Sequence, residues 1–191
     1  TELMPITYES PVASAQIKSA ILLAGLAAPG ETTVLENIAT RDHTERMLQH
    51  FGAEIRIDDN PRGGKKITVV GQPELTGCPV VVPADISSAA FPLVAALLAP
   101  KSKILIEAVG INPLRSGLLK TLVEMGADII QRKRTGTNGE PIADLTVRAS
   151  RLKGVQVPAE RAASMIDEYP IFAMAAAVAE GTTRMEGLEE L

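Results

Sequence analysis

The sequence predicts an α/β (α+β) fold made of a repeated βαβαββ unit, in cyclic order, with a period of about 75 residues. Residues 51–55 (FGAEI) are echoed 74 positions later by residues 125–129 (MGADI). At the same spacing, residues 14–16 (SAQ) fall on residues 88–90 (SAA), and a third copy begins near Ala162. Matching segments at one spacing indicate a structural unit that occurs more than once.

Each copy is expected to open with a helix of small apolar residues. These residues are apolar on nearly all sides, which is typical of a buried helix. The helices are predicted at 14–27, 86–99 and 162–179. A short strand rich in β-branched residues is expected after each of them, at 32–35, 104–106 and 182–185.

An amphipathic helix follows, at 42–51 in the first copy and 115–125 in the second. Apolar side chains line one face of each: Met47, Leu48 and Phe51 in the first, and Leu118, Leu119, Leu122 and Val123 in the second. Gly52 and Gly126 stand where a left-handed residue would end these helices. Further strands are predicted at 53–58, 65–71, 127–132 and 144–149, with strands entering the second and third copies at 79–83 and 155–158.

Composition narrows the class of protein. A formal net charge of −4 argues against a general nucleic-acid binder, because neutralising phosphates needs a basic face. No apolar run reaches the roughly 18–20 residues that span a bilayer, so no membrane partner is expected. The single cysteine, Cys78, excludes an internal disulfide and a cysteine-based metal cluster. Beyond this cysteine, His43 and His50, the chain has no histidine or cysteine to complete a metal site. We expect a soluble protein of a reducing compartment, the cytoplasm.

Three segments together resemble one enzyme family. Residues 11–20 (PVASAQIKSA), 40–45 (TRDHTE) and 164–170 (SMIDEYP) are similar to motifs of the 5-enolpyruvylshikimate-3-phosphate synthases, nearest the bacterial glyphosate-insensitive type. The resemblance runs along essentially the whole chain, with the motifs in the expected order. It implies a two-domain enolpyruvyl transferase-like inverse α/β barrel, in which three βαβαββ units form each domain around a pseudo-threefold axis.

On this resemblance the chain holds part of each domain. Residues 1–83 would be the last unit of the first domain, and residues 84–191 the first unit and the start of the next unit of the second domain. The family's Arg-Val-Lys-Glu-type motif, which supplies a catalytic lysine, glutamate and arginine, would follow Leu191. The fragment alone is therefore expected to be inactive.

The resemblance also implies the reaction. The family transfers the enolpyruvyl group of phosphoenolpyruvate to the 5-hydroxyl of shikimate 3-phosphate and releases phosphate, a step of aromatic amino acid biosynthesis. No metal or organic cofactor takes part. The expected partners are these two substrates, and the full-length parent is expected to be a monomer.

The expected substrate-binding residues in the first copy are Ser14, Ala15 through its backbone amide, Gln16 and Arg41. From the residues alone, Ser14 is more simply a helix N-cap, and Arg41 can be a surface arginine before an N-cap at Asp42. The same helix start can bind an anion, because its amides and dipole favour negative charge. The family resemblance assigns these residues to shikimate 3-phosphate.

The expected catalytic residue is Asp167, which is also expected to bind substrate. The resemblance assigns it to the 5-hydroxyl of the shikimate ring, as a base or as its positioning group. From the residues alone it could instead be a cap or an ion-pair partner at a helix start. Glu168 receives no role, and the segment from Asp85 to Ser88 is interpreted as a helix cap.

Two other functions remain open from the sequence. One is a UDP-N-acetylglucosamine enolpyruvyl transferase-like enzyme, which shares the fold and the phosphoenolpyruvate chemistry. It is disfavoured because the SAQ and MIDEYP segments match the shikimate branch. The other is a non-catalytic repeat scaffold, which the helix-cap interpretations allow.

Overall fold

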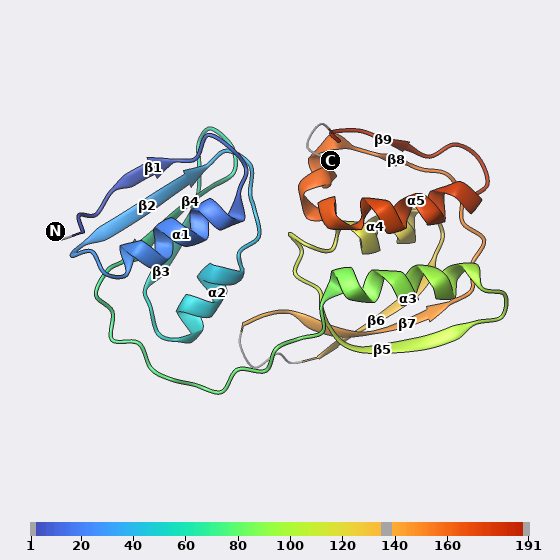
Figure 1. Cartoon of the computed structure of the whole chain (residues 1–191), viewed down its shortest axis with the longest axis horizontal. Helices are drawn as coiled ribbons and strands as arrows, with labels where there is room; N and C mark the ends of the chain where they lie inside the picture. The colour runs from blue at the N-terminus through green and yellow to red at the C-terminus, as the bar shows by residue number, and fades with distance from the viewer. Residues whose placement is uncertain (1–2, 135–138, 189–191) are drawn as a thin grey trace. The chain divides into compact units, whose positions relative to one another are not determined.

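A computed structural model describes residues 3–134 and 139–188 and confirms the mixed α/β fold (Figure 1). The chain divides into two compact units, with the main break between Val81 and Val82. Each unit has its own sheet, its own helices and its own apolar core.

The first unit is a four-stranded sheet covered by helices. Its strand order is β1-β2-β4-β3, with β1 parallel to β2 and the other pairs antiparallel. The strands are Thr7–Glu9, Glu31–Glu36, Lys65–Val70 and Ile55–Asp59, in that spatial order. Helix α1 (Ala15–Gly25) packs on β2 and β4. Gly25 permits this close approach, because a Cβ there would lie 2.8 Å from the Thr32 Cβ and 2.9 Å from the Val69 Cγ1.

Helix α2 (His43–His50) ends as the sequence predicts, because Gly52 adopts a φ of +94° that disfavours other residues. Leu48 is buried in the core, but Met47 is 48% exposed, so its predicted place on the buried face is wrong. Asp42 occupies the N-cap position without a side-chain cap bond. Its Oδ2 instead lies 2.8 Å from Nη2 of Arg46, one helical turn later.

The second unit contains the antiparallel sheet β5-β7-β6 and a short parallel pair, β8-β9. Helix α3 lies over the larger sheet, and α5 lies between α3 and the β8-β9 pair (Figure 1). Buried leucines of α4 join the same core. The bounds are α3 Ile86–Leu98, β5 Lys103–Gly110, α4 Gly117–Glu124, β6 Asp128–Arg134, β7 Ile142–Arg148, β8 Gln156–Val157, α5 Tyr169–Val178 and β9 Arg184–Met185.

The helix predicted at 162–179 is wrong in its first part. Residues Ala159–Ser164 and Ile166–Glu168 form 3₁₀ turns (η1 and η2), and the α-helix begins only at Tyr169. Pro170 explains the late start. Proline has no amide hydrogen and clashes inside a helix, so it fits only in the first turn, where it lies here.

The strand predicted at 79–83 is also wrong, because only Ala84 makes a bridge, in parallel with Val109. Pro79 and Pro83 at its two ends cannot donate backbone hydrogen bonds, which discourages a ladder. The bridge still preserves the repeat. In all three copies the entering segment runs parallel to the strand after the small-residue helix, as β1 with β2 and β8 with β9 also do.

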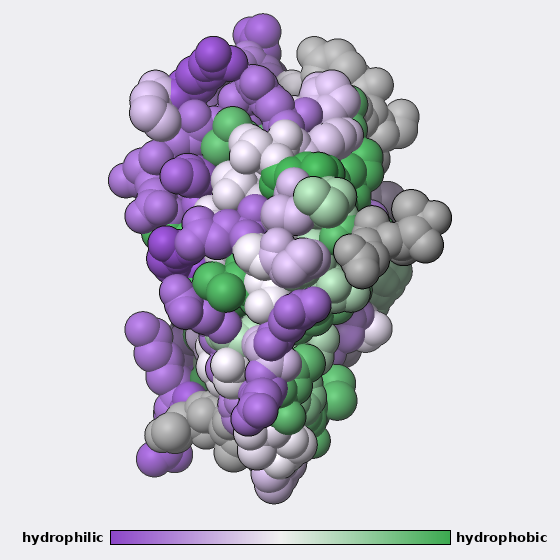
Figure 2. Space-filling view, turned by 90° about the vertical axis from the view of Figure 1, so that its left-hand side faces the viewer, coloured by the Kyte–Doolittle hydropathy of each residue, from purple (hydrophilic) through white to green (hydrophobic). Residues whose placement is uncertain are grey.

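The sequence predicted that the three small-residue helices would be buried on nearly all sides, and this prediction is wrong. Each exposes a large apolar side chain: Leu23 of α1 is 53% exposed, Phe91 of α3 60% and Met174 of α5 56%. Apolar residues also reach the surface in Figure 2, among hydrophilic ones. In the described part of the chain, no helix is both long and apolar enough to cross a membrane.

Candidate substrate-binding site

The start of α1 has the geometry of a capped helix N-terminus. Ser14 is extended, with φ −126° and ψ 112°, and its Oγ accepts a hydrogen bond from the Ile17 amide at 3.3 Å. The same hydroxyl donates to Gln16 Oε1 at 3.3 Å. The bond from the Ile17 amide confirms the predicted cap at Ser14. The first amides of a helix have no acceptor within the helix, so the start of α1 can also receive an anion.

A buried charged cluster lies under this helix start and consists of Lys18, Glu36, Thr40 and Glu45. We call it the Lys18 cluster. Lys18 is 1% exposed, and its Nζ lies 2.8 Å from Glu45 Oε1 and 3.2 Å from Glu36 Oε2. It also donates to the Thr40 carbonyl at 3.3 Å. Glu36 in turn accepts from the Thr40 amide at 3.0 Å and from the Thr40 hydroxyl at 2.8 Å.

The Lys18 cluster fixes the backbone on which Arg41 stands. Thr40 immediately precedes Arg41, and its carbonyl accepts a hydrogen bond from Lys18 of α1. After Arg41, the Thr44 hydroxyl lies 2.7 Å from the Ser19 hydroxyl of α1. Arg41 is thus held between two attachments to α1. The sequence interpretation gave Lys18 no role, although a lysine on an otherwise apolar helix is a signal of a buried ion pair.

One ammonium faces two carboxylates in this cluster. Burial raises the pKa of Glu45 above its ordinary value, and the hydrogen bond and charge of Lys18 oppose that rise. Glu45 Oε2 is buried without a hydrogen-bond partner among the described residues. The charge of Glu45 is therefore less well compensated by hydrogen bonds than that of Glu36.

We expect Glu45→Gln to reduce the loss of stability as the pH rises. The folded pKa of Glu45 lies above its unfolded value of 4.5, so the unfolded chain releases this proton first. The free energy of unfolding that this proton contributes is fully present below the unfolded pKa. It falls as the pH rises through the folded pKa, because the unfolded state then binds fewer protons than the folded state. Glutamine keeps an acceptor for Lys18 and carries no proton to lose.

The measurement is urea unfolding of the 191-residue chain at about pH 4.5 and about pH 7. The chain has two tyrosines and no tryptophan, so in a Tyr169→Phe background Tyr8 fluorescence reports only on the first unit. Glu54→Gln, at an exposed carboxylate of the same unit, is the control. Parallel pH profiles for Glu45→Gln and the parent would contradict the raised pKa.

In the second unit, Arg115 gathers four polar side chains, and we call the five residues the Arg115 cluster. Nη2 of Arg115 lies 3.4 Å from Asp167 Oδ2, 3.7 Å from Glu168 Oε1 and 4.0 Å from Asp85 Oδ1. The same nitrogen donates to Ser87 Oγ at 2.5 Å. The Asp167 side chain is 50% exposed, so its carboxylate is accessible from solvent.

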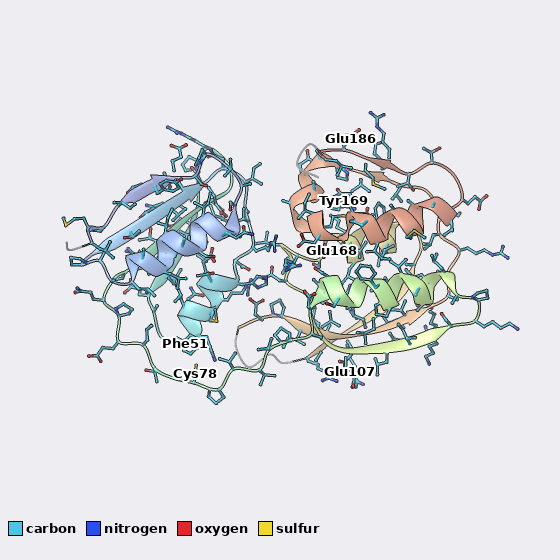
Figure 3. The ribbon with its side chains drawn as sticks, in the orientation of Figure 1. Phe51, Cys78, Glu107, Glu168, Tyr169 and Glu186 are labelled. Atoms are coloured by element: carbon cyan, nitrogen blue, oxygen red, sulfur yellow. The ribbon has the colours of Figure 1, made fainter. Side chains whose placement is uncertain are left out.

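Glu168 is the buried carboxylate of the Arg115 cluster. It is 2% exposed, accepts a hydrogen bond from Ser87, and lies at the start of α5 on the side of α3 (Figure 3). Burial raises the pKa of Glu168, while the Ser87 hydrogen bond and the charge of Arg115 oppose the rise. The sequence interpretation gave Glu168 no role and missed Arg115 and Ser87 as neighbours of Asp167 and Glu168. Their contacts join residues 28 to 81 positions apart, and no local pattern signals them.

Asp85 caps α3, which confirms the cap interpretation of this segment. Its Oδ2 accepts from the Ser88 amide and the Ser88 hydroxyl, both at 2.8 Å. The capping residue is thus the aspartate rather than a serine. Among the described residues, no group of three or more histidine, cysteine or acidic side chains is arranged to hold a metal ion.

The fold and these clusters define an α/β repeat protein with a capped helix start suited to an anion and, in its second unit, an accessible carboxylate held beside a guanidinium. The sequence model described as EPSP synthase (3-phosphoshikimate 1-carboxyvinyltransferase) matches residues 1–191. The chain belongs to the EPSP synthase family.

Individual relatives agree with this assignment. A 3-phosphoshikimate 1-carboxyvinyltransferase of Paramagnetospirillum magneticum is 70% identical over 187 residues, which are 98% of this chain and 42% of that protein. One from Methylorubrum extorquens is 65% identical over all of this chain and 42% of that protein. The chain thus spans about 42% of the length of these curated relatives.

Solved structures agree in fold. EPSP synthase from Acinetobacter baumannii superposes with a TM-score of 0.90 at 47% identity, over 100% of this chain and 42% of that one. The enolpyruvyl transferase NikO from Streptomyces tendae has a TM-score of 0.68 over 96% of this chain and 44% of that one. At 22% identity, the second likeness shows the fold alone.

Proposed function

We propose that this chain is part of an enzyme that transfers the enolpyruvyl group of phosphoenolpyruvate to the 5-hydroxyl of shikimate 3-phosphate. The reaction forms a bond from the 5-oxygen to C2 of phosphoenolpyruvate and breaks the bond from C2 to the phosphate oxygen, so that phosphate leaves. The observation that carries the proposal is the family match over residues 1–191, together with relatives of that name at up to 70% identity.

In the proposed enzyme, the start of α1 binds shikimate 3-phosphate. The Ser14 hydroxyl, the Ala15 amide and the Gln16 side chain offer hydrogen bonds from one helix end, and the helix dipole favours the negative phosphate. Arg41 adds a guanidinium, which pairs well with phosphate oxygens. The two attachments around Arg41 support this role, because they fix its backbone beside α1.

Asp167 acts on the 5-hydroxyl in this proposal, as a base or as the group that positions it. The transfer needs a proton acceptor for that hydroxyl, and an ionised carboxylate within hydrogen-bond reach can supply one. The half-exposed side chain of Asp167 is accessible for this contact. The other cationic and acidic groups of the reaction are expected from parts of the enzyme beyond this chain.

The proposal includes the domain assignment. Residues 1–83 form the last unit of one domain, and residues 84–191 the first unit and the start of the next unit of another. The exposed apolar side chains of α1, α3 and α5 support it, since helices of this composition are suited to burial against further units. The full-length protein is proposed to be a cytoplasmic monomer.

The binding role of Arg41 is testable in a chimera. In it, the 191 residues replace the matching segment of the P. magneticum relative, which supplies the remainder of an enzyme. We expect Arg41→Ala in the chimera to weaken shikimate 3-phosphate binding by about 1.5–3 kcal/mol, the range for a hydrogen bond to a charged group. Calorimetric titration at about 0.05 M and about 0.5 M salt should also show weaker binding to the unsubstituted chimera at the higher salt.

Arg56→Ala is the matched control, because Arg56 is an arginine of the same unit in an exposed pair with Glu31. It should leave the affinity unchanged. If Arg41→Ala and the unsubstituted chimera bind shikimate 3-phosphate equally well, Arg41 has no part in the site. If the chimera itself does not bind shikimate 3-phosphate, the proposed role of the α1 start is wrong.

A further inference from the structure

Arg115 stands at a rigid position in the second unit. Its backbone amide donates to the Asn112 carbonyl at 2.8 Å, and the Leu114 amide donates to Asn112 Oδ1 at 2.9 Å. Asn112 is itself 2% exposed. The Arg115 side chain is 19% exposed, so most of it lies within the protein rather than in solvent. This guanidinium is therefore built into the fold just before α4.

Asp167 stands at a less regular position. It belongs to the three-residue 3₁₀ turn η2, between η1 and α5. An aspartate with a half-exposed side chain can adopt several rotamers, whereas proton transfer requires the carboxylate within about 0.5 Å of its productive place. Some contact must select one arrangement. Arg115 provides a charge-assisted contact of 3.4 Å to Asp167 Oδ2.

Repulsion between neighbouring carboxylates makes the contact from Arg115 to Asp167 more important. Glu168, the next residue, is buried, and a carboxylate there repels the neighbouring Asp167 carboxylate when both are ionised. Arg115 lies within 4.0 Å of both and of Asp85, the cap of α3. Ser87 connects the same groups, since it accepts from Arg115 and donates to Glu168. Without the guanidinium, Asp167 would move away from Glu168 and from the start of α3.

We infer that Arg115 is a positioning residue that holds the Asp167 carboxylate beside the start of α3, in the arrangement that meets the shikimate 5-hydroxyl. This inference rests on the proposed function. Arg115 acts through Asp167 and needs no contact with substrate. Its removal should therefore slow turnover while leaving both substrates bound.

The test is steady-state phosphate release by the chimera. Arg115→Ala is expected to lower kcat by between about tenfold and about a hundredfold, with both KM values within about threefold of the parent. In an Asp167→Ala background the same substitution should cost no more than about twofold, because the residue through which it acts is gone. A general structural role would lower kcat equally in both backgrounds or raise the KM values, and either result would overturn the inference.

Two further variants keep the test decisive if Arg115→Ala does not fold. Each contact of Arg115 within its cluster is made by one nitrogen, Nη2, so the single ammonium of Arg115→Lys should recover kcat to within about threefold of the parent. Arg115→Gln carries no charge and should not recover kcat. Equal kcat values for the lysine and glutamine variants would reject the inference. Arg148→Ala is the control, since Arg148 pairs with Asp128 at 3.0 Å elsewhere in this unit, and its kcat should be unchanged.

The two proposals fail in different ways. If the chimera releases no phosphate, the proposed function itself is wrong. If the chimera is active and Asp167→Ala matches it, the proposed role of Asp167 is wrong, and the positioning role of Arg115 with it. If Asp167→Ala is impaired while Arg115→Ala matches the parent in kcat, only the positioning role is wrong.

Discussion

Asp167→Ala in the chimera is expected to lower turnover by about 10²–10⁴-fold, the range for loss of a general base. The affinity for shikimate 3-phosphate should remain within about tenfold, because most of the binding groups that we propose for it lie at the start of α1. Stopped or continuous phosphate assays give kcat, and titration calorimetry gives the affinity. The split between the two quantities separates a catalytic carboxylate from one that merely binds.

Asp128→Ala is the matched control for this substitution. Asp128 is also a partly exposed aspartate of the second unit paired with an arginine, Arg148, at 3.0 Å. It should leave turnover unchanged. Near-normal turnover of Asp167→Ala would return Asp167 to the role of an ion-pair partner at the start of α5.

Lys18→Met is expected to destabilise the first unit by about 3–5 kcal/mol, as for a buried ion pair that loses one partner. The substitution removes the cation and leaves Glu36 and Glu45 buried together, with side chains 4% and 1% exposed. Urea unfolding followed by Tyr8 fluorescence in the Tyr169→Phe background measures the change. Tyr169→Phe is a mild background, because the Tyr169 hydroxyl is buried with no partner among the described residues.

A control variant and a double variant test whether the loss of stability comes from the buried charges. Lys65→Met removes a lysine from an exposed pair with Asp59 and should leave the unfolding midpoint unchanged. Adding Glu45→Gln to Lys18→Met should restore part of the stability, because it removes one of the two uncompensated carboxylates. If Lys18→Met unfolds at the same urea concentration as its background, the buried cluster does not stabilise this unit.

The sequence predicted the repeated elements well because their causes are local. Alternation and apolar spacing placed the strands and helices, and Gly52 and Gly126 have the positive φ angles, +94° and +92°, that helix ends require. The errors also have local causes that the pattern concealed. Pro170 delays α5, and Pro79 and Pro83 prevent a ladder at 79–83.

The candidate site was predicted less completely, because its supporting contacts are distant in sequence. The cap at Ser14 depends on a residue three positions away, and the sequence predicted it. The bond from Lys18 to Thr40 spans 22 positions, and the contact from Arg115 to Asp167 spans 52. Family resemblance named the groups expected to touch substrate, but only the folded chain reveals the buried charges beneath them.

The most direct measurement is phosphate release by the unsubstituted chimera when it receives phosphoenolpyruvate with shikimate 3-phosphate, or with UDP-N-acetylglucosamine instead. The proposed function predicts sustained release with shikimate 3-phosphate, with the enolpyruvyl ether at the 5-position as product, and no release with the UDP-sugar. A folded chimera that turns over only the UDP-sugar, or neither acceptor, would contradict it.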